Sequence, residues 1–347
     1  MEEQVKIRFF GDFTTGENYQ AKYDVNQRKN VLRQKGYDYL LKDTKQFFEG
    51  SYNIINLESP ITDCISSDLE GRKAVLHWMD PEIAGSFLVK YGINSATLGN
   101  NHAYDYGKAG LIQTLGVLDN FGIEHFGAGL DKVSAGKPFV KTFQVGSKSV
   151  NLYVFGGYKY REDYDLEFDF YAKDNKPGVF LLTPETICDE ISNIKKNDKD
   201  SFVVIFPHFG FDLQKTNEHQ IKYSKAWIDS GADLVIGHGP HMMNRIEYYR
   251  EKPIVYSLGN FLFPSDFRDR MSPYNMIFEL ALVEEKGQIN TKYKLYPLYF
   301  NTNSTAPVMR PIDESEINGF LSMLTDNNDA IMDRINVVQE DIIWIEI

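Results

Sequence analysis

Short polar motifs that each follow an apolar run contain most of the residues able to perform chemistry. These motifs are Gly11-Asp12, Asn56-Leu57-Glu58, Asn100-Asn101-His102 with Asp105, Pro207-His208, Gly237-His238-Gly239-Pro240-His241 and Gly259-Asn260. Imidazole, carboxylate and amide groups together suit Zn, Mn or Fe better than Ca or Mg. Two such ions sharing a carboxylate could hold a bridging hydroxide. They could then stabilise both the attacking and the leaving group of a displacement at phosphorus or carbon. The motifs therefore predict a site for one or two divalent metal ions.

Each motif alone also has an ordinary structural interpretation. An aspartate after a strand commonly caps a helix or a turn, so Asp12 by itself is weak support. Glu58 could simply form an ion pair, and the Asn-Asn-His and His-x-x-His motifs could be surface turns. Their combination, with every motif after a predicted strand, favours the metal site. His77, His125 and His219 lack this context, and we expect them on the surface or in packing.

Apolar runs and helical patterns alternate along the chain and would bring these motifs together. Strands are predicted at 5–10, 52–57, 93–98, 202–206, 234–236 and 253–257, helices at 31–48, 81–91, 107–121, 184–195 and 218–229, and a hairpin at 139–155. The alternation indicates parallel strands covered by helices, and the hairpin adds antiparallel strands. We therefore expect a layered α/β sandwich with mixed sheets, in which ligands bind beyond the carboxyl ends of the strands.

No stretch rich in Pro, Gly or Ser divides the chain into domains. We expect one domain over residues 1–305 and a helical extension over 306–347 that packs on it. Residues 158–178 look like an insertion, because their first part is aromatic and acidic without a clean period. This insertion is interpreted as a loop or lid, with an ordinary surface excursion as the alternative.

Composition and charge exclude several classes of protein. With 37 Lys and Arg against 49 Asp and Glu, the net charge is −12, which argues against broad nucleic-acid binding. Cys64 and Cys188 cannot form a disulfide framework, so a reducing compartment is the easier interpretation. Neither a signal peptide after Met1 nor an apolar run of transmembrane length is present. We therefore expect a cytoplasmic protein without a transmembrane anchor.

The motifs in combination resemble the CapA family, named for capsule and poly-γ-glutamate synthesis. The matching segments are Gly11-Asp12, NLESPIT (56–62), NNHAYDYG (100–107), HFGFD (208–212), GHGPH (237–241) and YSLGNF (256–261). Their order is that of the family, and the resemblance covers roughly residues 5–300. The fold of that family is similar to the calcineurin-like metallophosphoesterases, so the resemblance implies a four-layer α/β/β/α sandwich.

The resemblance also implies roles for individual residues. It makes metal ligands of the following residues, with Glu58 as the bridging carboxylate: Asp12, Glu58, Asn101, His208, His238 and His241. His102 would be the general acid, or would stabilise charge that develops on the substrate, and Asp105 would orient it. The residues expected on the substrate side are Asn56, Lys73, Asp212 and Asn260. For Lys73 and for the neighbouring Arg72, a solvated surface charge is the alternative.

Two departures from the related sequences bear on activity. Related phosphoesterases have Asp-x-His in the first loop, whereas this chain has Asp12-Phe13-Thr14. One metal position therefore lacks an imidazole, a loss that the CapA family shares, and this puts phosphatase activity in doubt. In addition, Phe209 and Asp212 stand where the family has Trp and Glu, and Asp212 reaches one methylene less far.

The first functional hypothesis is a metal-dependent hydrolase of poly-γ-glutamate or cell-envelope polymer metabolism. In it, a metal-bound hydroxide would attack a phosphoester or an amide-type bond. The alternatives are a non-catalytic component of polymer synthesis with a degraded site, and a small-molecule phosphodiesterase or phosphatase. The acidic stretch at 162–169 would repel a long anionic polymer, so a small anionic substrate or a polymer end is the expected partner. The sequence leaves the oligomeric state open.

Overall fold

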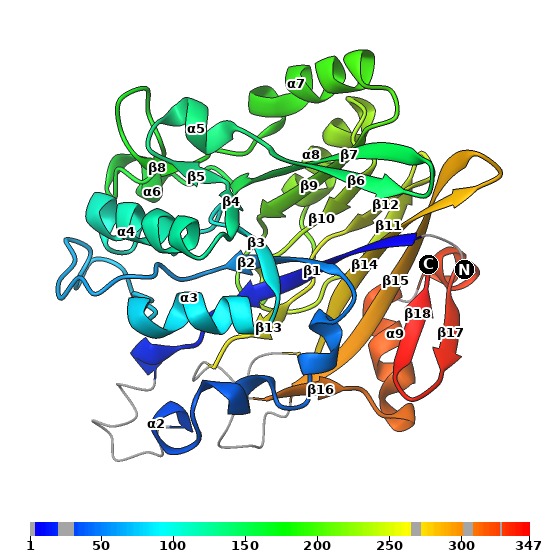
Figure 1. The fold of residues 1–347 in the computed structure, drawn as a ribbon, viewed down its shortest axis with the longest axis horizontal. Coiled ribbons are helices and arrows are strands. Elements are labelled where there is room, and N and C mark those ends of the chain that lie inside the picture. The colour runs from blue at the N-terminus through cyan, green and yellow to red at the C-terminus, as the bar shows by residue number, and fades with distance from the viewer. Residues whose placement is uncertain (1–3, 20–30, 265–271, 301–307, 327) are drawn as a thin grey trace.

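Two mixed β-sheets with helices beside them form the described part of the chain (Figure 1). The computed structural model describes residues 4–19, 31–264, 272–300, 308–326 and 328–347. The mixed α/β class predicted from the sequence is confirmed. The expected domain boundary between residues 305 and 306 lies outside the described residues.

The larger sheet has ten strands and carries the N-terminal strand near its middle. Its order is β17 (Asn336–Gln339), β18 (Ile343–Glu346), β15 (Gln288–Phe300), β14 (Tyr274–Glu285), β1 (Gln4–Phe13), β2 (Tyr52–Leu57), β3 (Ile93–Thr97) and β4 (Glu124–Phe126). Two short strands lie off this path, β13 (Asn260–Leu262) beside β1 and β16 (Met309–Pro311) beside β15. Because β1, β2, β3 and β4 are parallel, their carboxyl ends meet at one edge.

The smaller sheet has six strands, of which the middle four are parallel. Its order is β11 (Ile246–Tyr249), β12 (Lys252–Val255), β10 (Leu234–Ile236), β9 (Phe202–His208), β7 (Lys148–Tyr158) and β6 (Phe139–Val145). The predicted hairpin is confirmed as β6 and β7, which pair antiparallel. A separate two-stranded ladder joins β5 (Ala128–Gly129) to β8 (Gly178–Val179).

Helices fill the connections between these strands. They are α2 (Val31–Lys35), α3 (Pro81–Lys90), α4 (Gly107–Asn120), α5 (Lys132–Gly136), α6 (Glu162–Leu166), α7 (Pro184–Asn197), α8 (Glu218–Asp229), α9 (Ile317–Thr325) and α10 (Asp329–Met332), with 3₁₀ turns at Tyr37–Leu41, Lys45–Phe48 and Glu314–Glu316. Figure 1 shows α3 and α4 beside β2 and β3, and α7 and α8 on the side of β7 and β9.

The buried apolar residues form three main clusters, which follow from the alternation of side chains along each strand. Phe10 and Ile55 point to α3 and α4 and pack with Leu88 and Leu111. Their strand neighbours point the other way and pack against the six-stranded sheet, as Phe9 does with Phe206. On the outer face of the six-stranded sheet, Ile205 and its neighbours pack with α7 and α8 residues such as Ile191 and Trp227.

One predicted helix is interrupted, and the reason is local. The sequence pattern predicts a helix over 31–48, but α2 stops at Lys35 and two 3₁₀ turns follow. Gly36 adopts a φ of 75°, a left-handed conformation that ends the helix and that glycine adopts at little cost. The prediction of one continuous helix was therefore wrong, because the apolar spacing alone did not account for this glycine.

The C-terminal segment is more than the expected helical extension. It contains α9 and α10, but β16 and β18 pair with β15, and β17 pairs with β18. Phe320 and Leu324 of α9 are buried in the cluster between the sheets. The expected helical extension is therefore only partly helical, since short apolar runs such as Ile343–Glu346 extend the sheet.

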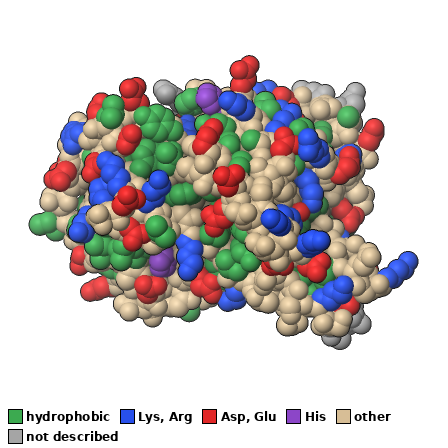
Figure 2. All heavy atoms as spheres, turned by 90° about the horizontal axis from the view of Figure 1, so that it is seen from above, with side chains coloured by type: hydrophobic (Ala, Val, Ile, Leu, Met, Phe, Trp, Pro, Cys, Tyr) green, Lys and Arg blue, Asp and Glu red, His purple; other side chains and the backbone are tan. Residues whose placement is uncertain are grey.

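The distribution of surface charge and the length of the helices bear on what the protein can bind. Figure 2, which views the molecule from above relative to Figure 1, shows Lys and Arg side chains interspersed with Asp and Glu, without a continuous basic area on that face. Within the described ranges, no helix combines the length and the apolar character that crossing a bilayer requires.

Candidate metal centre

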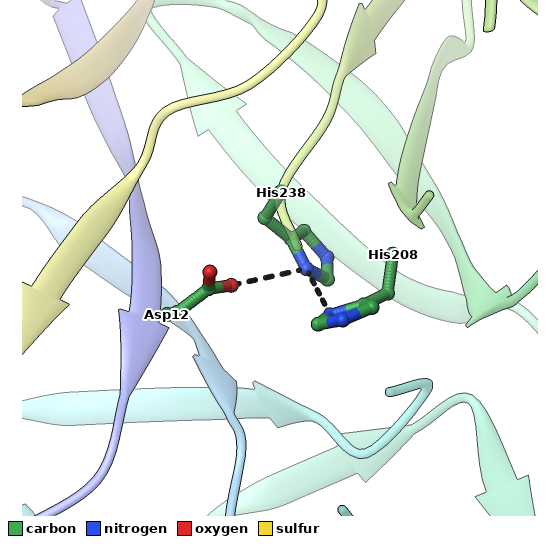
Figure 3. A group of neighbouring side chains, drawn as sticks. All are labelled: Asp12, His208 and His238. Carbon is green, nitrogen blue, oxygen red and sulfur yellow. Dashed lines mark hydrogen bonds and ion pairs between the residues drawn. The ribbon is translucent and has the colours of Figure 1, made fainter. Parts of the chain in front are cut away.

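The predicted ligands lie at the carboxyl ends of strands from both sheets. Asp12 is the penultimate residue of β1, and Glu58 directly follows β2. His208 ends β9, while His238 and His241 follow β10. Since both sheets direct these ends to the same place, residues far apart in the sequence become neighbours. Figure 3 shows the Asp12, His208 and His238 side chains converging.

Asp12, His208 and His238 form a first group whose ligand atoms lie within 4.8 Å of one another. His238 Nδ1 lies 3.5 Å from Asp12 Oδ1 and 3.0 Å from His208 Nδ1. His238 Nε2 lies 3.2 Å from the Phe206 carbonyl oxygen, a partner that can only accept a hydrogen bond. In a neutral ring the proton therefore sits on Nε2, and the Nδ1 lone pair faces the group, as in a metal-ligating histidine.

Asp12, Glu58 and His241 form a second group with the same 4.8 Å limit. His241 Nδ1 lies 3.1 Å from Asp12 Oδ2, and His241 Nε2 lies 3.6 Å from Glu58 Oε1. Glu58 Oε1 is also 3.8 Å from His208 Nε2. Asp12 is thus the carboxylate common to both groups, whereas the family resemblance assigned the bridging role to Glu58.

Several polar atoms of this centre are buried without a hydrogen-bond partner. Both Glu58 carboxylate oxygens, Asp12 Oδ2 and Asn101 Oδ1 are in this state. Burying an ionised carboxylate without a compensating partner costs roughly several kcal/mol. Such groups therefore normally pair with a cation or a hydrogen-bond donor. Oxygen and imidazole donors facing one another in this way fit a divalent cation of the Zn, Mn or Fe type.

The protonation states of the centre reflect the same crowding of acceptors. Burial, followed by the charge of Asp12, raises the pKa of Glu58 well above its usual value. Burial, followed by His238, lowers the pKa of His208. Burial opposes the protonation of His241, but Glu58 and Asp12 outweigh it and raise the pKa of His241 to about 10. The acidic groups around His241 therefore favour its charged form.

The loop after β10 needs unusual backbone conformations to present its histidines. Gly239 has a φ of 111°, and a Cβ atom there would lie 2.8 Å from His208 Cδ2 and Nε2. His241 adopts a φ of 56°, which is uncommon for a residue with a side chain. In the Gly-His-Gly-Pro-His motif, Gly239 thus lets the backbone approach the His208 ring closely, and His241 has a strained backbone conformation.

A hydrogen-bond network beside the candidate metal ligands holds His102. Its Nδ1 lies 2.6 Å from Asp105 Oδ2, and Lys73 Nζ donates to Asp105 Oδ1 at 2.5 Å. Lys73 Nζ also donates to the Asn101 carbonyl oxygen at 2.6 Å. The backbone N–H of His77 donates to Asp105 Oδ2, and the His77 and His102 rings are 3.8 Å apart. Asp105 is therefore placed to orient His102, as the resemblance implies.

Two of the four residues expected on the substrate side contact the candidate metal ligands. Asn56 is fully buried, and its Nδ2 donates to Asp12 Oδ1 at 2.8 Å. Asn260 Oδ1 lies 3.0 Å from His241 Nδ1. Lys73 lines a cavity, but its ammonium group is taken up by Asp105 and its neighbours. Asp212 alone of the four is exposed, at the mouth of the centre.

Two cavities adjoin the centre. Lys73 and Asp212, which the sequence placed on the substrate side, line the larger one, whereas Lys159, which the sequence did not single out, lines the smaller. The larger, of about 390 Å³, is lined by His102 and His241 and by the aromatic residues Tyr19, His77, Tyr164, Phe168 and Phe263. The smaller, of about 240 Å³, is lined by His208, Lys159 and Arg161. Lys159 directly follows β7, but the sequence pattern ended that strand three residues earlier, so the residue was assigned to an irregular insertion. His77 was expected in packing and is buried.

Comparisons with known proteins point to one family. The family described as "Bacterial capsule synthesis protein PGA_cap" matches residues 6–265. "PGA biosynthesis protein CapA" of Bacillus subtilis is 29% identical over 287 residues, which cover 81% of this chain and 70% of that protein. "Capsule biosynthesis protein CapA" of Bacillus anthracis is 24% identical over 321 residues, covering 91% and 72%.

A third relative and one solved structure are more distant. "Probable polyglutamine synthesis accessory protein Rv0574c" of Mycobacterium tuberculosis is 30% identical over 213 residues, but the match covers 60% of this chain and 54% of that protein. The solved structure "GAP50 the anchor in the inner membrane complex of Plasmodium" aligns with a TM-score of 0.38 and 10% identity, over 92% of this chain and 95% of that one. A likeness at that level supports no structural argument.

Proposed function

Because the chain belongs to the PGA_cap family of bacterial capsule synthesis proteins, we propose that it is a metal-dependent hydrolase in capsule or poly-γ-glutamate synthesis. The observation that carries the proposal is the pair of ligand groups that share Asp12. Both Glu58 oxygens are buried without a hydrogen-bond partner, while the imidazole nitrogens of His241 and His208 lie 3.6 Å and 3.8 Å from Glu58 Oε1. This combination is costly for a protein that binds no cation there and is ordinary for one that does.

We further propose a four-layer α/β/β/α sandwich of the metallophosphatase type as the scaffold. The three apolar clusters support it, since one lies between the two sheets and one lies between each sheet and its helices. In such an arrangement the carboxyl ends of strands from both sheets open onto one site. The C-terminal segment, with its strands on β15, would be an extension of this single domain.

In the proposed centre, His208 and His238 with Asp12 would hold one ion, and Glu58 and His241 with Asp12 a second. Asn101 offers its unpartnered amide oxygen to the same centre. A divalent ion bound there would act as a Lewis acid and lower the pKa of a water molecule toward neutrality. The donor set favours Mn, Zn or Fe.

His102 would act on the substrate by proton transfer. With Nδ1 bonded to Asp105, its Nε2 is the nitrogen left to exchange a proton with the leaving group. The Lys73 ammonium group holds Asp105 from the other side, so the imidazole has one orientation. The scissile bond would be a phosphoester or an amide-type bond of an anionic substrate.

Metal analysis tests the proposal at its base. We expect one or two Mn, Zn or Fe ions per purified chain and their loss in the double variant His208→Ala with His241→Ala. A matched control replaces His125 and His219, which lie outside the centre, and should keep the metal content. A folded, metal-free protein without affinity for added Mn would refute the enzyme proposal.

A substrate panel then tests turnover. Mono- and bis-esters of p-nitrophenyl phosphate and γ-glutamyl oligomers cover both bond types. His102→Ala should lower the rate by about 100-fold or more, which is the usual range for a general acid or base. If metal binds but His102→Ala leaves turnover intact, the role of His102 is wrong.

The second candidate is a non-catalytic component of capsule polymer synthesis. One observation favours it: the second ligand group contains a single imidazole, because Thr14 stands where related phosphoesterases have histidine. Metal binding at full occupancy without turnover of any substrate in the panel would support this alternative over the hydrolase.

A further inference from the structure

We propose that Lys159 and Arg161 form a binding site for an oxyanionic group, a carboxylate or a phosphate, that the substrate carries beside the bond at the metal centre. The inference rests on the proposed function and narrows its substrate class. It requires a substrate with a second anionic group in addition to the one that reacts.

The position of Lys159 follows from the pairing of β7 with β9. Tyr158 is the register partner of His208, so the next residue, Lys159, leaves the sheet beside a metal ligand. The backbone N–H of Lys159 donates to the His208 carbonyl oxygen at 3.3 Å, which fixes this placement. The lysine is therefore tied to the same sheet edge as the centre.

The ammonium group of Lys159 lacks a carboxylate partner within ion-pair distance among the described residues. It donates to the Gly210 carbonyl oxygen and lies 4.0 Å from the centre of the Phe211 ring. One carbonyl occupies one of its three donors. The residue is only partly exposed and lines the 240 Å³ cavity together with His208.

Arg161 adds a second cation to the same cavity. Its Nε and one terminal nitrogen bond Asp163 at 3.0 Å and 2.5 Å, and the Tyr158 side chain also hydrogen-bonds to the guanidinium, which still leaves some of its five N–H donors for a ligand. Because the protein carries a net charge of −12, a local pair of cations is needed to attract an anion to this edge. Guanidinium and ammonium groups are the usual partners of carboxylates and phosphates.

The two cavities lie on either side of the reacting position. Both are lined by Asn101, Arg161 and Asp212, so they meet at the centre. The 390 Å³ cavity combines aromatic residues with Arg72 and Lys73, and Lys73 is paired with Asp105, whereas the 240 Å³ cavity contains Lys159, for which the described residues offer no carboxylate within ion-pair distance. A substrate that spans the centre would thus place its anionic substituent on the His208 side and the rest of its chain on the His102 side.

Two matched pairs of probes test this on the Mn-loaded full chain. Tri-γ-glutamate and tri-γ-aminobutyrate share an amide backbone, but only the first carries α-carboxylates beside the amide bonds. Thymidine 5′-(p-nitrophenyl phosphate), with and without a 3′-phosphate, forms the phosphate pair. We expect the charged member of one pair to be favoured by about 10-fold or more in kcat/KM, the size of a charge-assisted hydrogen bond. The pair that shows the preference identifies a carboxylate or a phosphate.

Variants connect that preference to the residues. Lys159→Met should abolish it by weakening only the charged probe, and Lys159→Arg should retain most of it. Lys173→Met is the matched control, because Lys173 belongs to the same insertion but pairs with Asp169. Arg161→Met, at an exposed position, provides the same readout if Lys159→Met fails to fold.

The outcomes separate this inference from the proposed function. If no probe is turned over, the hydrolase proposal fails, and the dissociation constants of the same pairs, measured by calorimetry with Mn present, still test the site. A wild-type protein that does not distinguish the charged from the neutral members would overturn the inference. So would a Lys159→Met variant that weakens both members equally.

Discussion

Arg8 and Asp12 lie four residues apart on β1, and both are buried charges, yet their surroundings differ. Arg8 Nε donates to Glu279 Oε2 at 2.7 Å, and its other nitrogens reach the Phe47 and Glu49 carbonyl oxygens and the Tyr296 hydroxyl. Every nitrogen of that guanidinium therefore finds an acceptor within the protein.

Asp12 and its neighbours show the opposite situation. Here the buried groups are mostly acceptors that face other acceptors, and both oxygens of Glu58 lack a donor. The difference teaches how to distinguish a structural charge from a ligand-binding one. A charge whose partners are all supplied by the chain stabilises the fold, whereas a cluster short of donors is arranged for a group from outside.

The largest expected effect comes from breaking the Arg8–Glu279 ion pair, in which every guanidinium nitrogen has an acceptor while Glu279 Oε1 has no hydrogen-bond partner. Arg8→Met leaves Glu279 buried without a cation and with only the Tyr296 hydroxyl as a donor, so the free energy of unfolding should fall by about 3–5 kcal/mol. Urea unfolding monitored by circular dichroism measures it. The double variant Arg8→Met with Glu279→Leu should recover much of the loss. A loss below about 1 kcal/mol for Arg8→Met would show that the pair is not the structural charge described here.

Gly239→Ala tests the centre without replacing any of the proposed metal ligands. The added Cβ would lie 2.8 Å from the His208 ring, so the ring must move, and we expect metal affinity to fall by about 10–100-fold. Competition with a fluorescent chelator measures this affinity. Gly116→Ala, in the interior of α4 with no atom within 4 Å of its added Cβ, is the control and should leave affinity unchanged. Equal affinities for both variants would contradict the crowding around His208.

Two buried asparagines on β2 provide the next comparison. Asn56 Nδ2 donates to Asp12, whereas Asn53 Nδ2 donates to the Phe48 and Gly92 carbonyl oxygens. Asn56→Ala should weaken metal binding by about 10-fold, because it loosens a ligand. Asn53→Ala should lower stability with metal affinity unchanged. If both variants bind metal alike, Asn56 does not position Asp12.

The smallest effect concerns a paired carboxylate away from the centre. Burial acts to raise the pKa of Glu247, but hydrogen bonds from Lys225 and Tyr256 outweigh it, and the pKa lies below its usual value. Its contribution is therefore present above the ordinary pKa of about 4.3 and disappears as the pH falls through the lower folded pKa. Glu247→Gln should cost at most about 1 kcal/mol at pH 7.

The pH dependence of unfolding provides the control for this last variant. The difference between the wild type and Glu247→Gln should shrink as the pH falls below about 4. A difference that grows with acidification would reverse the sign derived from the lowered pKa.

The side chains that gather at the candidate centre could be picked out from the sequence, because they lie at or shortly after the end of a strand whose apolar run is strong. His208, for example, ends the fully buried strand β9. Helix α8 was predicted with the same bounds, since its apolar period is regular and Asn217 caps it. The predicted helix over 31–48 failed at Gly36, where the backbone conformation rather than the apolar spacing decides.

The supporting residues could not be assigned in this way. Asn56 is 44 positions from Asp12, and Lys73 is 32 positions from Asp105, so their partners depend on the tertiary fold. Lys159 was missed for a similar reason, because its position beside His208 results from the pairing of β7 with β9. Sequence patterns identify groups that can bind a metal, but which side chains hold them in place is decided by contacts between distant elements.

The division of the ligands between the sheets has a mechanical consequence. The carboxylates come from the ten-stranded sheet and the three histidines from the six-stranded sheet or the loop after β10. A bound ion would therefore link the two sheets. Because it would bind only the folded protein, the melting temperature would rise with the ion concentration. Chelation should speed amide hydrogen exchange in the inner strands β1 and β9 before it affects α7 or α8.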